Sequence, residues 1–172
     1  SGGNPAQLNW TPTSVDVGEH LITLSTTDGQ GRTTTQSLLL SVTNPADIPA
    51  DPGKEAPTLQ LGTPFAQSSE FLYKGPNPTQ KDIDPTVISP EKAIVLRGKV
   101  TDRNGNPLPG VTVSVWGHPE FGHTQTRSDG WFDMAANGLG MMVLEYSKPG
   151  YMKAQRKLDT NWRDFNIAEE VA

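Results

Sequence analysis

Alternating hydrophobic and polar residues predict β-strands in the second half of the chain. Residues 111–116 alternate valine with polar or aromatic residues, which is the period of a strand that buries one face. The same apolar parity recurs at Ile94, Leu96 and Val100, at Phe132 and Met134, and at Leu144 and Tyr146. Residues 155–158 and 165–167 are expected to close the sheet. We therefore expect an all-β fold in which residues 93–172 form an antiparallel β-sandwich.

Tight turns separate these predicted strands. Asn104-Gly105 and Asp129-Gly130 tolerate the positive φ angles that short hairpin turns require. Lys148-Pro149-Gly150 ends the predicted strand that contains Leu144 and Tyr146, because proline cannot continue a strand ladder and glycine permits a sharp reversal. The spacing of strands and turns is that of a small sandwich.

Residues 1–44 are expected to belong to a second sandwich. Three strands are predicted there, at 8–10, 20–26 and 33–43, with Ile22 and Leu24 on one face and Leu38, Leu40 and Val42 pointing inward. This segment resembles the C-terminal half of a cadherin-like or immunoglobulin-like repeat. Three strands can bury a face only if something covers it. We expect its partner strands to lie upstream, the alternatives being the rest of this chain or a second copy.

Residues 45–92 hold most of the prolines and are expected to connect the two parts. Residues 44–54 are typical of a semi-stiff linker, 56–62 and 65–73 contain possible short strands, and 75–90 favours an extended connector. We expect this lead-in segment to wrap on the domain at 93–172, with Phe71, Leu72 and Tyr73 as anchors.

Composition narrows the functional class. The 172 residues include 17 Gly and 15 Pro, which disfavours long helices. A net charge of -5 without a basic stretch disfavours nucleic-acid binding, and no apolar run approaches the length of a membrane span. The absence of Cys excludes thiolate zinc sites and thiol nucleophiles. Since small secreted eukaryotic domains usually carry disulfides, it also favours a bacterial protein or a module of a larger chain.

Three motifs carry a family resemblance. G-K-V-T-D-R-N-G-N-P-L-P-G-V-T-V, S-D-G-W-F-D and K-P-G-Y together resemble the carboxypeptidase regulatory-like domains, which have a transthyretin-like fold. Residues 118–138 are similar to the module that precedes the propeller and YD-repeat shell of bacterial Rhs proteins and animal teneurins, the fibronectin-plug type. The resemblance implies a non-catalytic structural module that plugs or braces a toxin-enclosing shell. Its implied partners are the propeller and shell of the same parent chain, and its implied location is secreted or on the bacterial surface.

The segment 118–138, which carries the more specific resemblance, contains the residues of our candidate interface. These are His118, Pro119, Glu120, Phe121 and Trp131. Core burial of the same aromatic residues is the alternative. A metal site at His118, Glu120 and His123 is disfavoured, because H-P-E-F-G-H lacks a spacing that converges three ligands. Asp102, Asn104 and Asn106 are not followed by the acid that a calcium loop needs, so they favour turn chemistry.

A covalent isopeptide crosslink between Lys99 and Asn166, promoted by Glu145, is another candidate feature of the sandwich. Related pilin and adhesin domains join such residues covalently. Strand parity disfavours it, because the apolar neighbours of all three residues would place these polar side chains in solvent.

One functional alternative, an adhesin or carbohydrate-binding module, stays open beside the structural module. No nucleophile–base arrangement is visible, and we expect neither enzymatic activity nor a cofactor. An adhesin or carbohydrate-binding sandwich would use exposed aromatic residues, for which Trp116, Trp131 and Trp162 are the candidates. The same three tryptophans are also large enough to dominate the energetics of the core or of an interface. A glycan or protein surface contact is therefore possible, without nucleic-acid binding or membrane insertion.

Overall fold

The structure is a computed structural model that describes residues 9–42, 44, 48–49, 51–54, 56–58, 60–138 and 140–172. The chain divides into two compact units, Ser1–Asn44 and Pro45–Ala172. Within the described residues, no helix is long and apolar enough to span a membrane.

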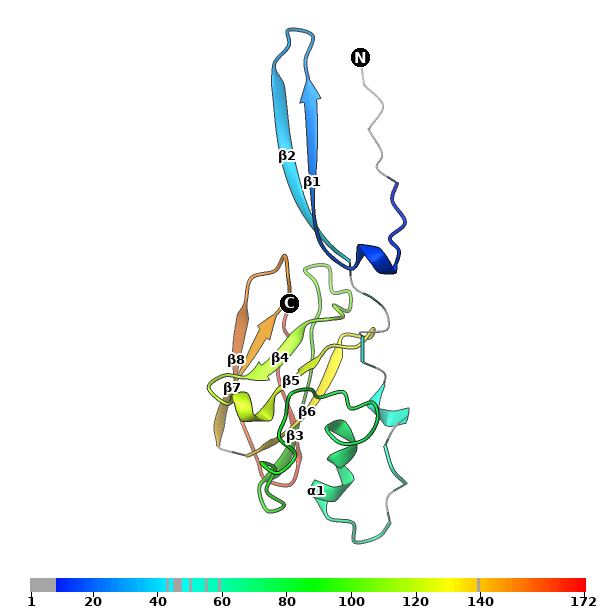
Figure 1. Ribbon diagram of the computed structural model, residues 1–172. Helices are drawn as coiled ribbons and strands as arrows, with labels where there is room; N and C mark the ends of the chain where they lie inside the picture. Colours follow the sequence, from blue (N-terminus) through cyan, green and yellow to red (C-terminus); the bar gives the residue numbers. More distant parts are fainter. Residues whose placement is uncertain are drawn as a thin grey trace. The chain divides into compact units, whose positions relative to one another are not determined.

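The first unit is a β-hairpin that follows a short 3-10 turn, η1 (Ser14–Asp16) (Figure 1). Strand β1 (Gly18–Thr27) pairs antiparallel with β2 (Thr33–Val42). Asp28 closes the turn, since its carboxylate accepts hydrogen bonds from the backbone N–H groups of Gln30 and Arg32, both at 2.9 Å. These Asx-type contacts fix the hairpin register locally.

The hairpin buries none of its described side chains. Ile22 pairs with Leu38, as the predicted faces require, but Leu38 is exposed and so are Leu24 (54%) and Leu21 (68%). The expected strand at 8–10 is wrong for Asn9 and Trp10, which are not in a strand, while Leu8 lies outside the described residues, as does Thr43. A two-stranded ribbon has no second layer of its own, so the predicted half-sandwich remains a prediction.

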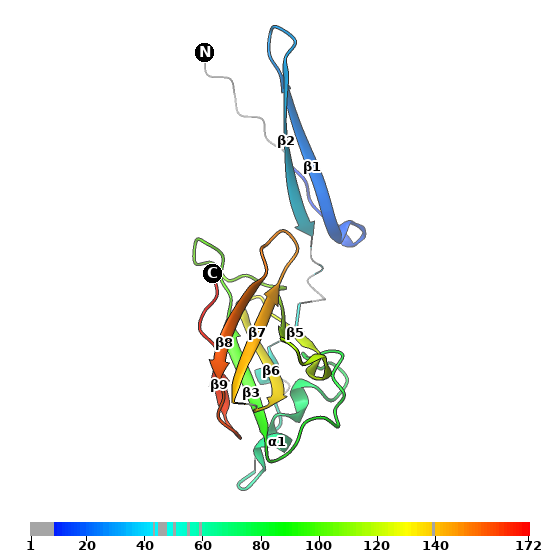
Figure 2. The same cartoon turned by 90° about the vertical axis from the view of Figure 1, so that its left-hand side faces the viewer.

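The second unit is a β-sandwich of two sheets (Figures 1 and 2). One sheet has the order β6-β3-β9, and its strands are β3 (Ala93–Lys99), β6 (Trp131–Asn137) and β9 (Phe165–Ile167). The other has the order β5-β4-β7-β8, and its strands are β4 (Thr112–Val115), β5 (His123–Gln125), β7 (Met141–Ser147) and β8 (Ala154–Asp159). The all-β sandwich is therefore confirmed. One pairing differs from the expected antiparallel pattern, because β9 runs parallel to β3.

The predicted inward positions form the core. Ile94, Leu96 and Val100, together with Phe132, Met134, Leu144, Tyr146 and the valines of 111–115, are all buried. Phe132 packs edge-to-face on Tyr146, with ring centroids 5.8 Å apart. The ring of Phe132 lies against Gly98, where any added Cβ would come within 2.7 Å of it. The Phe132 ring thus fills the space left by a glycine in the neighbouring strand of the same sheet.

The lead-in segment folds as short helical turns, which corrects the prediction of short strands at 56–62 and 65–73. It contains η3 (Pro52–Lys54), α1 (Phe65–Ser68) and η4 (Glu70–Leu72), and no described residue of 45–92 belongs to a named strand. Serine hydroxyls at 68 and 69 donate to the carbonyl of Phe65, which stabilises the helical turn. Leu59 lies outside the described residues.

The lead-in packs on the sandwich. Leu72 and Tyr73 are buried in the common core, and Phe71 packs against it in part. The expected anchors are therefore in place. Buried Gln80 adds a polar attachment, because its Nε2 donates to the carbonyls of Phe121 (2.7 Å) and Ala135 (2.9 Å). The folded unit consequently begins well before the first strand of the sandwich.

The last strand corrects the parity argument at the C-terminal end. Asn166 is buried, whereas Phe165 and Ile167 are exposed. The Asn166 side chain is held by its own loop, accepting from Asn161 N at 2.7 Å and donating to the carbonyls of Asn161 and Asp164. Glu145 lies in the other sheet, where it binds Lys153 and Gln155. The structure thus brings no triad of Lys99, Glu145 and Asn166 together.

Candidate functional site

The loop between β4 and β5 forms a short 3-10 helix, η5 (Pro119–Phe121). Its shape is fixed by backbone bonds, from Phe121 N to His118 O (3.3 Å) and from Gly122 N to Pro119 O (2.9 Å). Phe121 is buried and anchors the loop in the core, while Pro119 and Glu120 are exposed. The core alternative therefore describes Phe121 correctly, and the accessible part of the candidate interface is residues 118–120.

The His118 and Glu120 side chains are joined by a hydrogen bond on this loop. His118 Nδ1 lies 2.9 Å from Glu120 Oε1, and the imidazole stacks on the Phe121 ring with centroids 5.7 Å apart. The hydrogen bond from His118 holds the pKa of the Glu120 carboxyl below its usual value. His123 instead faces Asp82, with 3.4 Å between Nδ1 and Oδ2. In the described chain, no three His, Cys, Asp or Glu side chains could together hold a metal ion.

The backbone of the loop approaches the lead-in segment closely at Gly122. Its φ is +61°, and an added Cβ would lie 2.0 Å from the carbonyl oxygen of Lys81. Lys81 and His123 exchange backbone hydrogen bonds of 2.8 and 3.0 Å at this point. Only glycine permits this approach. The loop is therefore held in place by the buried Phe121 ring and by its backbone contacts with the lead-in segment.

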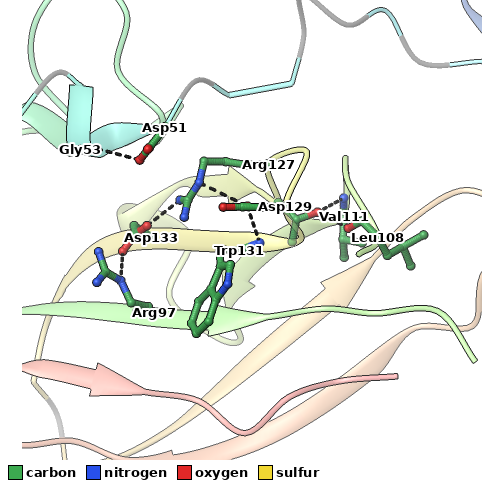
Figure 3. A network of polar contacts seen from close by, with 10 residues as sticks. Asp51, Gly53, Arg97, Leu108, Val111, Arg127, Asp129, Trp131 and Asp133 are labelled. Carbon is green, nitrogen blue, oxygen red and sulfur yellow. Dashed lines mark hydrogen bonds and ion pairs between the residues drawn. The ribbon is translucent and has the colours of Figure 1, made fainter. Parts of the chain in front are cut away.

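Trp131 does not extend this loop. It opens β6 in the other sheet, is half-buried, and lies opposite Lys99 on β3. The turn before it is built as predicted, because Asp129 Oδ1 accepts from Trp131 N at 3.0 Å. Through this backbone N–H, Trp131 contacts Asp129, which belongs to a different set of residues shown in Figure 3.

That set is a buried ion network that the sequence did not reveal. The Asp133 carboxylate, 1% exposed, binds Arg97 Nε at 2.5 Å and Arg127 Nη1 at 2.6 Å (Figure 3). Arg127 Nε has no hydrogen bond, but Asp129 lies 3.6 Å away as a second carboxylate. Two cations and two anions therefore balance, with Asp133 the most deeply buried.

The network is suited to fixing structure. Arginine stays protonated at any physiological pH and cannot exchange protons with a substrate. A carboxylate shared by two guanidinium groups is held in one orientation, and here it joins β3, β6 and the turn before β6. Its face of the sheet also carries Val95 and Ala135, both buried. In the sequence, the apolar residues Val95 and Ala135 were the signal that this face of the sheet is covered by other parts of the domain.

The Asp102 turn has the chemistry that the sequence predicts. Asp102 Oδ1 accepts from the N–H groups of Asn104 (2.8 Å) and Asn106 (2.9 Å), and Asn106 Nδ2 donates to Oδ2 at 3.1 Å. Both carboxylate oxygens are engaged within the turn. The side-chain hydrogen bond from Asn106 is the main cause that lowers the Asp102 pKa.

Comparison with known proteins gives this architecture a family. The family model described as "Teneurin TTR-like domain" matches residues 88–172. Teneurin-3 of Danio rerio is 29% identical over 144 residues, which cover 80% of this chain and 5% of the relative. Teneurin-1 of Gallus gallus (38% identical) and Teneurin-m of Drosophila melanogaster (35%) match over 80 residues each, 46% of this chain and 3% of the relative. Residues 88–172 are a transthyretin-like domain of the teneurin family.

Proposed function

We propose that this chain is a non-catalytic structural module of a large teneurin-like YD-repeat protein, in which the transthyretin-like domain braces or plugs a propeller and shell. The family match of residues 88–172 carries the proposal. The matched stretches span only 3–5% of these relatives, so a parent chain of that size leaves room for such a shell. A shell that encloses a toxin, and a bacterial cell-surface or secreted parent, are finer parts of the proposal; they rest on the motif at 118–138 and the absence of Cys.

The loop at 118–120 is our proposed contact with that shell. A contact loop needs a defined shape before binding, since ordering it on binding costs free energy. This loop is pinned by the buried Phe121 ring and by the close approach of Gly122 to Lys81. Its exposed surface combines the Pro119 ring with the paired His118 and Glu120 side chains. Shape and polar complementarity would provide recognition, without chemistry on a substrate.

The proposal is tested with a shell fragment made from the same parent gene. We expect the 172-residue chain to bind that fragment, and Glu120→Arg to weaken binding about tenfold or more through reversed charge. Glu169→Arg changes the same charge on an exposed residue near the chain's end and serves as control. Equal binding by wild type and the Glu120 variant would reject the loop as contact. A parent gene without propeller and YD repeats would reject the module itself.

An adhesin or carbohydrate-binding module is the second candidate, favoured by two exposed tryptophans. Trp116 and Trp162 are each 61% exposed, so neither is a core residue, and both present ring surface for stacking on a sugar ring. They lie on separate elements, because Trp116 follows β4 while Trp162 sits between β8 and β9 against Gly138. Glycan-array binding that is lost in Trp116→Ala or Trp162→Ala would favour this candidate over the structural module.

A further inference from the structure

A cavity of about 530 Å³ lies between the lead-in segment and the face of the β6-β3-β9 sheet that carries the Asp133 network. Both views of the fold show α1 beside β3 at this place (Figures 1 and 2). The walls of the cavity are mainly apolar and include Phe65, Phe71, Val95 and Phe165. Its volume lies within the range of small-molecule sites, and the proposed contact loop does not line it.

Arg97 brings unused hydrogen-bond donors to this cavity. Its Nε donates to Asp133 Oδ1 at 2.5 Å, while the other carboxylate oxygen, Oδ2, accepts from Arg127 Nη1 at 2.6 Å (Figure 3). The two terminal nitrogens of Arg97 therefore have no carboxylate, and no other described residue accepts a hydrogen bond from them. The Arg97 side chain lines the cavity and is 41% exposed, so a ligand can reach it. Two terminal guanidinium nitrogens form a planar fork that matches the two oxygens of a carboxylate.

Aromatic rings hold the Arg97 guanidinium in one orientation. Its Cζ lies 5.2 Å from the centroid of the Phe165 ring, and Phe65 packs edge-to-face on Phe165 with ring centroids 5.5 Å apart. A donor that is oriented before binding loses little freedom when a ligand arrives. Asp133 is the only acid among the described residues of the lining, and it divides its charge between Arg97 and Arg127. Arg97 therefore keeps part of its positive charge for a ligand.

We propose that this cavity binds a small aromatic carboxylate, whose two oxygens accept hydrogen bonds from the terminal nitrogens of Arg97 and whose ring packs among Phe65, Phe71 and Phe165. A neutral apolar molecule would leave the guanidinium fork unused. A hydrophilic anion would gain nothing from the apolar walls, because their contribution comes from burying hydrophobic surface. The site is independent of the proposed shell contact, so either proposal can fail alone.

The test uses the 172-residue chain, 2-naphthoate as probe and 2-naphthamide as its neutral isostere. In a two-dimensional NMR titration, we expect saturable shifts of the backbone amide signals of Leu72, Val95 and Phe165, which line the cavity, with a Kd on the order of 1 mM or tighter. The amide should bind about tenfold more weakly, because it lacks the charge that pairs with Arg97. The absence of saturable shifts, or equal binding of acid and amide, would overturn the proposal.

Three variants decide whether the named residues are responsible. Arg97→Met should weaken naphthoate about tenfold and leave the amide unchanged, so that this variant no longer prefers the acid. Equal weakening of both probes would show that Arg97 only maintains the structure, and unchanged naphthoate binding would show that it is not the donor. Phe165→Leu, at a position 52% exposed, keeps the ion network and should weaken both probes about fivefold through loss of the ring; unchanged binding there would contradict the aromatic wall. Arg103→Met removes an exposed arginine that does not line this cavity and should leave both affinities as they are.

Discussion

The side-chain amide of Gln80 binds both backbone polar groups of Ala135: Oε1 accepts from Ala135 N at 2.7 Å, and Nε2 donates to Ala135 O at 2.9 Å. This is the pattern that a neighbouring strand would offer to the free edge of β6. Gln80 lies eight residues before the stretch that matches the family model. The lead-in is thus part of the folded domain, and the edge strand is covered by a side chain.

Gln80→Ala tests that attachment. The substitution leaves the Ala135 N–H and the carbonyls of Ala135 and Phe121 without a partner, so we expect a loss of about 2–4 kcal/mol in the free energy of unfolding. Urea denaturation measures it. The exposed Gln67 on α1 is the control, and Gln67→Ala should change stability by less than about 0.5 kcal/mol. Equal effects at the two positions would contradict a stabilising role for the Gln80 hydrogen bonds.

The Asp133 network should respond unequally to removal of its two arginines. The Arg127 side chain is buried, whereas the Arg97 side chain is 41% exposed. Water can therefore solvate Asp133 more easily when Arg97 is removed than when Arg127 is removed. We expect Arg127→Met to cost about 3 kcal/mol or more and Arg97→Met about 1 kcal/mol. Thermal unfolding in the two variants gives the order directly. Arg103→Met, on an exposed turn, is the neutral control. A reversed order would show that burial does not determine the strength of these contacts.

Alanine substitutions at Gly105 and Gly122 distinguish the cost of a positive φ angle from the cost of a steric clash. Gly105→Ala introduces a side chain at φ +81° into open space, which should cost about 1 kcal/mol. Gly122→Ala adds the clash with the Lys81 carbonyl to a similar positive φ, so it should displace the lead-in as well as destabilise the domain. Hydrogen exchange at Lys81 and His123 reports the displacement. If both variants exchange like wild type, the close approach at Gly122 is not required.

The Asp102 turn predicts a dependence of stability on pH. Hydrogen bonds, first from the Asn106 side chain, lower the Asp102 pKa in the folded state, so the unfolded state binds the proton more readily. Its stabilising contribution is present above the ordinary aspartate pKa of about 4 and disappears as pH falls through the lower folded value. The stability difference between wild type and Asp102→Ala should therefore be largest near neutral pH and vanish in strong acid.

How far the sequence determines this fold depends on what each residue contacts. The valines at 111, 113 and 115 bury one face against a sheet, so their alternation predicted a strand and its inward side. The turns at Asp102 and Asp129 depend on contacts within a few residues and were predicted for the same reason. Local chemistry sufficed in both cases.

The errors arise from contacts that the hydrophobic pattern does not encode. The apolar positions at Phe65, Phe71 and Tyr73 fit a strand as well as short helical turns, because a brief apolar run has no decisive period. In β9, Asn166 is turned inward by bonds to its own loop, while Phe165 packs edge-to-face on Phe65 of the lead-in. Asp133 is buried because two arginines pair with it, Arg127 six residues earlier and Arg97 on the neighbouring strand. None of these partners could be identified from spacing along the chain.

The most direct test of the proposed structural role is a cryo-electron microscopy structure of the full parent protein. The account predicts that the domain at 88–172 is packed against a propeller and YD-repeat shell, with residues 118–120 in the contact. A parent that lacks a shell, or one in which this domain projects freely with residues 118–120 in solvent, would contradict it.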